Sequence, residues 1–304
     1  MFNNHAGINL AEAKLQIVEI TYKGSSFYLE NVDQTFHTEN LDPSVSESKM
    51  ISILQESFKR ITKKKSLISK NISFAIPNNF FKIFEVPYDD SLVKKDLYDH
   101  FKWEISILFP DCDADNFYVQ HIQVDKTEIR KEKCAVIFAI DKTIVSVINK
   151  FCLHNNLTLK YIDNAHLASN AFLYLDRKNE ERELSLSIYI DQNYSSIAAL
   201  EGVHPFYFDV VRPPVQNIFD SLTSSISKIE AFNLSITDFS SVFFYGQDLT
   251  EEFESKIRNH FKIPIKKIDP FERLKVDEAV YNNTFYKVKS NSFTAAAGIA
   301  IRII

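Results

Sequence analysis

The N-terminal part of the chain contains two runs in which apolar and polar residues alternate, over 15–22 and 26–32, with Gly24 between them. Alternation on both sides of a glycine turn predicts an antiparallel β-hairpin. The next segment, 44–61, has apolar residues at helical spacing and a capping box that begins at Ser44. The pattern therefore predicts a hairpin followed by an amphipathic helix.

A short apolar run over 72–77 ends at Pro77, which predicts a buried strand. From about residue 80, the pattern predicts a smaller unit with the order strand, helix, strand, strand, helix, strand. Its predicted strands cover 81–86, 117–124, 134–140 and 157–162, and its predicted helices cover 91–109 and 142–154. A further helix capped by Asp163 or Asn164 is expected to follow.

The second half of the chain begins after a polar linker, 179–183, and repeats the opening pattern of the first half. Its predicted strands cover 184–191, 197–201, 206–211, 241–246 and 263–267, and its predicted helices cover 213–232, 250–261 and 292–304. Asn9 lies six residues before Leu15, just as Asp191 lies six residues before Ile197. This internal match predicts a duplicated fold with βββαβα order in each half.

Composition limits the classes of function. A chain of 304 residues with 45% hydrophobic residues predicts about two domains with a sizeable core. The net charge of −5 argues against nucleic acid as the main partner, because phosphate backbones bind basic surfaces. Three cysteines without a CxxC motif favour reduced thiols over disulfides or a zinc site. We find neither a signal peptide nor an apolar stretch of the ~20 residues that span a bilayer.

Four short patterns carry candidate chemistry, and for each a plain structural role is the better interpretation. Residues 111–117 resemble the start of a calcium loop but lack its later glycine and glutamate, which favours a solvated acidic loop. His100 and Glu104 share a helix face without further zinc ligands, which favours a surface pair. Cys134 and Cys152 lie within apolar periodicity and are predicted to be core thiols.

The fourth pattern is the basic cluster Lys59–Lys65 at the end of the first predicted helix. Cations there complement the helix dipole and need no partner. The alternative is contact with anionic lipid headgroups, to which each charge near a membrane surface contributes about 1 kcal/mol.

Six segments carry a resemblance through their order and spacing. They are GINLAEAKLQIVEI (7–20), ISFAIPNNFFKIFEVPYDDSLVKKDLYDHFKWEISILFP (72–110), VIFAIDKTIVSVINKFCLHNNLTLKYIDNAHLASNAFLYL (136–175), LSIYIDQNYSSIAAL (186–200), VFFYGQDL (242–249) and AAAGIAIRI (295–303). Together they resemble PilM-like proteins of the type IV pilus inner-membrane platform, which belong to the actin-like ATPase superfamily and are more distantly related to FtsA.

The resemblance implies an α/β, actin-like (ribonuclease H-like), two-lobed duplicated fold. Residues 1–79 and 163–180 would form the first lobe, 80–162 an inserted β-α-β-β-α-β subdomain, and 181–304 the second lobe. It also implies a cytoplasmic protein peripheral to the inner membrane that binds the cytoplasmic tail of a bitopic, PilN-like membrane protein. The machine would assemble pili or carry out type II secretion.

The resemblance also locates a candidate ATP site, and the sequence departs from its pattern there. Asn9 and Ala11 stand where the first phosphate loop has Asp and Gly, and Gln16 stands at its polar anchor position. In the second loop Asp191 matches the family Asp, whereas Asn193 replaces a glycine. Gly246 is the single glycine of the adenosine loop. Glycines let phosphates approach the backbone, so we expect a degenerate site.

We therefore expect no catalytic residues, no metal site and no required cofactor in this chain. The favoured hypothesis is a non-catalytic scaffold that captures the partner's tail in a groove between the first lobe and the 80–162 unit, with self-association as a further option. The alternative is an ATP-binding, Mg²⁺-dependent ATPase or nucleotide-gated switch of the same fold. A sugar or small-molecule kinase would need an intact phosphate loop and a catalytic Asp.

Overall fold

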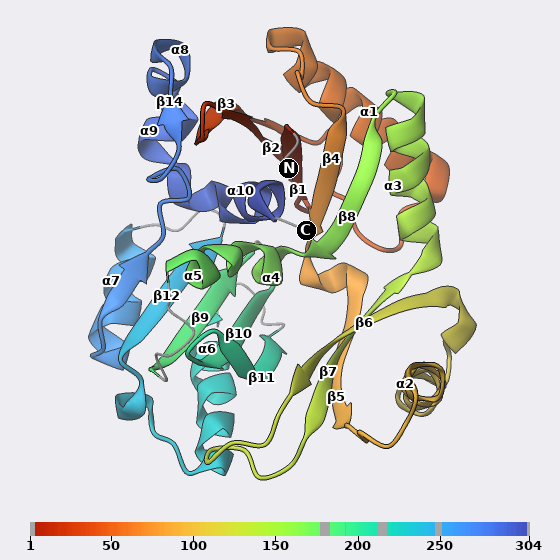
Figure 1. The fold of residues 1–304 in the computed structure, drawn as a ribbon, viewed down its shortest axis with the longest axis vertical. Coiled ribbons are helices and arrows are strands. Elements are labelled where there is room, and N and C mark those ends of the chain that lie inside the picture. Colours follow the sequence, from red (N-terminus) through yellow and green to blue (C-terminus); the bar gives the residue numbers. More distant parts are fainter. Residues whose placement is uncertain (1–3, 177–182, 192, 212–217, 247–250, 303–304) are drawn as a thin grey trace.

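The computed structural model describes residues 4–176, 183–191, 193–211, 218–246 and 251–302. Two large sheets and one small sheet organise these residues (Figure 1). No helix in the described ranges combines the length and the apolar composition needed to cross a bilayer.

The first sheet has six strands in the order β14-β3-β2-β1-β4-β8. Their bounds are β1 His5–Leu10, β2 Lys14–Lys23, β3 Ser26–Phe36, β4 Asn71–Ile76, β8 Thr158–Asn164 and β14 Lys275–Val276. Strands β1, β2 and β3 form an antiparallel meander, and β4 and β8 add in parallel. Helices α1 (Glu47–Lys64) and α3 (Lys142–His154) pack against each other beside this sheet, as the upper right of Figure 1 shows.

The second sheet repeats this arrangement, with the strand order β11-β10-β9-β12-β13. Its strands are β9 Leu184–Ile190, β10 Ser195–Glu201, β11 His204–Val211, β12 Ser241–Gly246 and β13 Ile265–Lys267, and its helices are α6 Ile218–Ser227 and α7 Glu251–Phe261. Again three antiparallel strands are followed by two parallel ones. This common topology agrees with the duplication inferred from the sequence.

The third sheet is the small β5-β7-β6 sheet, formed by β5 Phe81–Pro87, β6 Phe117–Val124 and β7 Cys134–Asp141. Helix α2 (Lys94–Leu108) packs on it through Leu97, Phe101 and Ile105, all buried. The expectation that the separate unit extends to residue 162 is wrong. Strand β8 (Thr158–Asn164) pairs in parallel with β4 and so belongs to the first sheet, because β4 offers that sheet a free edge.

The assignment of residues 181–304 to the second lobe is also wrong for the C-terminal segment from β14 onwards. Strand β14 pairs with β3 of the first sheet, and α10 (Thr294–Ile301) contacts β1 and β2. Two short helices, α8 (Glu278–Tyr281) and α9 (Thr284–Val288), lie with them at the upper left of Figure 1. The chain thus returns to the first sheet, because the apolar, small-residue face of α10 fits closely on it.

Three helix predictions need correction. Helix α1 begins after Ser46 without a side-chain cap, because Ser44 donates to Asp42 instead of closing a capping box. The helix predicted to follow Asp163 or Asn164 is capped by Asn164, as expected. It is not continuous, however, but divides into α4 (Ala165–Ser169) and α5 (Ala171–Asp176). The predicted 213–232 helix is α6 followed by a 3-10 turn, Lys228–Phe232, and the predicted start at Pro213 lies outside the described residues. Further 3-10 turns cover Asn78–Phe80, Ala114–Asn116, Ile236–Asp238 and Ser290–Phe293.

Candidate functional site

The first candidate site is formed by the two hairpin turns, which follow β1 and β9. The turns contact each other directly, because the Asn193 Nδ2 amide donates a 2.7 Å hydrogen bond to Glu12 Oε2. Glu12 belongs to the turn between β1 and β2, and Asn193 belongs to the turn between β9 and β10. The space between the two turns is therefore bridged by the protein's own side chains. Glu12 was not identified from the sequence. The signal that could have identified it is an acidic residue within the first turn.

Behind the first turn, Asn9 and Gln16 are fully buried and bonded to each other. Asn9 Nδ2 donates to Gln16 Oε1 at 2.9 Å, and Gln16 Nε2 donates to Gln34 Oε1 at 3.1 Å. The three amides form a chain across β1, β2 and β3. The Oδ1 atom of Asn9 has no hydrogen-bond partner within the described part of the chain.

Ala11 lies at the end of β1 and is buried, so its methyl group occupies space that a glycine would leave open. Its carbonyl accepts a 3.2 Å hydrogen bond from His37 Nε2, and His37 Nδ1 lies 2.8 Å from Ser57 Oγ. Burial lowers the pKa of His37 to about 4, so its imidazole is neutral at pH 7. The hydrogen bond from His37 thus fixes the backbone at Ala11.

Asp191 and Gly246 come together at the ends of β9 and β12. The Asp191 N–H closes the second turn with a 2.7 Å bond to the Tyr194 carbonyl. Gly246 is aligned with Ile190 in the parallel register and has φ +118°. A Cβ at Gly246 would lie 1.9 Å from the Ile190 carbonyl oxygen, so close strand packing by itself requires this glycine.

The second candidate site is a groove of about 500 Å³ between the small sheet and the edge of the first sheet. Strand β8 is the last strand of the first sheet and β6 is the last strand of the small sheet. The lining is mostly apolar and aromatic: Phe81, Tyr98, Tyr118, Val119, Gln120, Phe138, Ile140, Val145, Leu159, Lys160, Tyr161 and Ile162. Two strand edges thus meet at an apolar groove.

No protein-family model and no curated protein matches the sequence. Among solved structures, the chain is similar to the PilM–PilN type IV pilus biogenesis complex, with a TM-score of 0.72 at 14% identity over 98% of both chains. It is also similar to a Bacteroides thetaiotaomicron protein with an actin-like ATPase fold and unknown function, with a TM-score of 0.54 at 10% identity over 97% of this chain and 95% of that chain. The chain has the actin-like ATPase fold. The resemblance found in the sequence is confirmed at the level of the fold.

The residues at the two turns of this actin-like fold do not fit a Mg²⁺–triphosphate group. The Glu12 carboxylate, held by Asn193, lies between the turns, and it would repel phosphate oxygens of the same charge sign. The Asn9 Nδ2 amide is engaged by Gln16 Oε1 and so is not available as a donor to a phosphate. The link between the two turns, from Asn193 to Glu12, appears only in the structure.

The junction of the two lobes contains a buried polar network that the sequence did not reveal. His166 is completely buried, with Nδ1 2.7 Å from Ser196 Oγ and Nε2 2.5 Å from Ser187 Oγ. Asn78 Nδ2 donates to the same Ser196 Oγ at 3.0 Å, and Asn164 Nδ2 donates to Asn78 Oδ1 at 2.8 Å. The network ties the ends of β4 and β8 to β9 and β10. Burial lowers the pKa of His166 to about 3, so the network contains a neutral imidazole.

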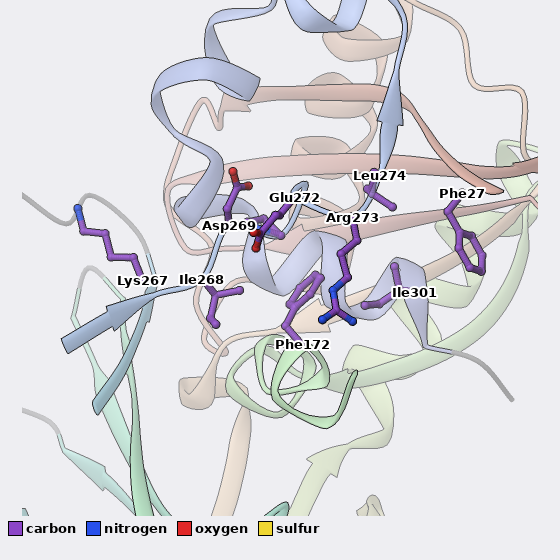
Figure 2. Close-up of a pocket in the computed structure, with 10 residues that line it drawn as sticks. Phe27, Phe172, Lys267, Ile268, Asp269, Glu272, Arg273, Leu274 and Ile301 are labelled. Atoms are coloured by element: carbon purple, nitrogen blue, oxygen red, sulfur yellow. The ribbon is translucent and has the colours of Figure 1, made fainter. Parts of the chain in front are cut away.

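A smaller cavity of about 250 Å³ lies between α5, the end of α10 and the segment that follows β13 (Figure 2). Phe27, Phe172, Ile268 and Ile301 make its lining largely apolar. The Arg273 side chain reaches down between Phe172 and Ile301 in Figure 2. The cavity is lined by none of the residues that the sequence indicated for the ATP site.

The remaining sequence candidates have structural roles. In the Lys59–Lys65 cluster, Lys64 pairs with Asp33 at 2.9 Å, and Lys65 donates to the Glu30 carbonyl. Cys134 and Cys152 are buried, and burial raises the pKa of both thiols to about 12. His100 Nε2 lies 3.8 Å from Glu104 Oε1. In the described part of the chain, no cluster of three or more His, Cys, Asp or Glu side chains is placed to hold a metal ion.

Proposed function

We propose that this protein is a non-catalytic scaffold in the inner-membrane platform of a pilus or type II secretion machine. It would bind the cytoplasmic tail of a bitopic, PilN-like membrane protein and would itself be cytoplasmic and peripheral to the membrane. The observation that carries the proposal is the apolar groove between the edge strands β6 and β8. The likeness to a PilM–PilN complex supports this assignment of the partner.

The groove has the features that capture of an extended peptide requires. An edge strand presents backbone N–H and C=O groups that can pair with an added strand. Tyr118, Phe138 and Tyr161 supply apolar and aromatic surface for alternate side chains of the peptide. Lys160 adds one cation to the lining of the groove. A bound peptide with an acidic residue opposite Lys160 would be favoured by it.

The closed junction between the turns supports the non-catalytic part of the proposal. Peptide capture needs no acid, base or metal, and the bond between Asn193 and Glu12 links the two turns that would hold a nucleotide. Membrane contact would run through the partner, since Lys64 and Lys65 already bind groups of the first lobe. Self-association is compatible with the scaffold role.

The second candidate function is a nucleotide-gated switch. It is favoured by one observation, the buried Oδ1 of Asn9, which has no partner in the described residues and could accept a hydrogen bond from a ligand. In that case Asp191 is the carboxylate that would hold Mg²⁺ through water. The two functions differ in whether Mg²⁺–ATP binds at all.

Calorimetric titration separates the two functions. We expect a peptide from the cytoplasmic tail of a PilN-like, bitopic membrane protein to bind, with the same affinity in the presence and absence of Mg²⁺–ATP. Tyr118→Ala removes a half-exposed ring from the groove and should weaken peptide binding about tenfold, as expected for the loss of one large apolar contact. Mg²⁺–ATP alone should give no binding heat.

The matched control is Tyr281→Ala, which removes an equally exposed ring from α8, far from the groove. This variant should bind the peptide like the unmodified chain. Saturable Mg²⁺–ATP binding, together with loss of peptide affinity when Asp191 is replaced, would contradict the scaffold and support the switch.

A further inference from the structure

Helix α2 carries apolar residues on two faces, although one face is enough to hold it on the small sheet. Its inner face buries Leu97, Phe101 and Ile105. On the outer face, Trp103 is 57% and Ile107 is 59% exposed. Surface helices of globular proteins usually place polar residues on the face that points away from the core. A tryptophan and an isoleucine one turn apart on this face therefore need an explanation.

The outer residues follow a regular spacing. Asp96, His100, Trp103 and Ile107 lie 4, 3 and 4 residues apart, which is the spacing of a helix-packing seam. We call these four residues the outer stripe of α2. The His100 and Trp103 rings stack with a centroid distance of 6.1 Å, so the middle of the stripe is a continuous aromatic surface. Figure 1 shows α2 at the lower right periphery of the molecule, viewed along its axis.

The charge around the outer stripe is strongly negative. The segment 87–116, which contains α2 and its flanking loops, has eight acidic residues and three lysines. Its net charge of −5 equals that of the whole chain. Of the three lysines, Lys102 is paired with Asp115 at 2.5 Å. Asp90 and Asp115 are paired with Lys133 and Lys102, whereas Asp96 and Asp99 lie on the same helix as Trp103 and Ile107. This combination is complementary to a surface that carries both apolar and cationic residues.

We propose that the outer stripe of α2 docks a basic amphipathic helix of a partner protein. Such a helix would place its apolar face on Trp103 and Ile107 and its lysines or arginines beside the flanking carboxylates. A second copy of this chain would bring two acidic segments together, and an anionic membrane would be repelled by them. The proposal is independent of the groove, which lies between the small sheet and β8, and so does not rest on the proposed function.

Trp103 is the only tryptophan of the chain, so its emission reports directly on the stripe. The probe is a synthetic peptide of two heptads, about as long as α2, with leucine at the a and d positions and lysine elsewhere. Titration of the full chain with this peptide should shift the emission to shorter wavelength and saturate. The affinity should fall as NaCl is raised from 50 to 500 mM, because the charges are exposed to solvent.

Two variants test the two components of the surface. Ile107→Ser should weaken the peptide about tenfold, since an exposed apolar contact is lost while the helix core is untouched. Asp96→Asn combined with Asp99→Asn should weaken it severalfold at 50 mM NaCl. Leu153→Ser is the matched control, because Leu153 is 67% exposed on α3, and it should change nothing. Circular dichroism should show that all variants remain folded.

Other occupants give different results. Equal binding of a peptide with glutamate in place of lysine would overturn the proposal, and so would the absence of any emission shift. A shift caused by phosphatidylglycerol vesicles but not by the peptide would assign the stripe to a membrane. A shift that appears on concentrating the chain alone would assign it to a second copy.

Discussion

Replacing Gly298 with alanine is expected to lower the free energy of unfolding by about 3 kcal/mol or more. Helix α10 crosses α4 at this residue, and an added Cβ would lie 1.9 Å from the Ala168 carbonyl oxygen. The oxygen belongs to the backbone of α4, and the position of the Cβ is fixed by the backbone of α10, so no side-chain rotation can relieve the overlap. A chain of this kind has about 5–15 kcal/mol of stability in total, so the loss is large.

Urea denaturation followed by circular dichroism measures this effect. Gly24→Ala is the control, because a Cβ at Gly24 meets nothing within 4 Å and only the positive φ of +55° opposes it. That cost should be about 1 kcal/mol. Gly7→Ala should resemble Gly298→Ala, since its Cβ would lie 2.0 Å from the Ala296 carbonyl oxygen. Equal effects of Gly24→Ala and Gly298→Ala would show that α10 does not pack on α4 as described.

Acidification from pH 7 to pH 5 is expected to lower the free energy of unfolding by about 5 kcal/mol. Burial lowers the pKa of His5 and His37 to about 4 and that of His166 to about 3. In the unfolded chain each imidazole takes up a proton below pH 6.5, whereas in the folded chain it stays neutral. Stability is therefore complete above pH 6.5 and falls as the pH drops towards 4.

Urea titrations at pH 7, 6 and 5 measure this slope. His37→Gln should reduce it by about a third, because one of the three imidazoles with the largest pKa shifts is removed while a side chain able to donate and accept hydrogen bonds remains. Carboxylates whose pKa is lowered, such as Asp42 and Asp115, act only below about pH 4. Burial raises the pKa of Glu19, which acts with the opposite sign to the imidazoles. Imidazole NMR signals of the folded chain that all titrate near pH 6.5 would contradict the prediction.

The effect at Gly298 and the His166 part of the pH effect originate where the two lobes of the actin-like fold meet near the C-terminal helix. Gly298 brings α10 against α4, and His166 of α4 bonds to β9 and β10 through its two serine partners. The junction is thus close-packed and internally hydrogen-bonded.

Local sequence patterns were sufficient for most strands and helices. Alternation around Gly24 predicted the first hairpin, and the Asn164 side chain caps the helix that the sequence placed after it. The matched spacing of the two halves predicted sheets of common topology. The hairpin and the helix cap depend on neighbours within a few residues, and the duplication shows as a repeated pattern, which is why a single sequence reveals them.

The sequence by itself determined the α/β class, the duplication, the positions of the two turns and the loss of glycines from them. Only the tertiary structure decided that β8 and β14 join the first sheet, that Asn193 reaches Glu12 and that His166 lies at the junction of the lobes. The physical reason is that a strand pairs with whichever sheet edge is open, and a buried polar group bonds with whichever partner the packing brings near. Those choices depend on residues that are distant in the sequence, such as Glu12 and Asn193, which are 181 positions apart.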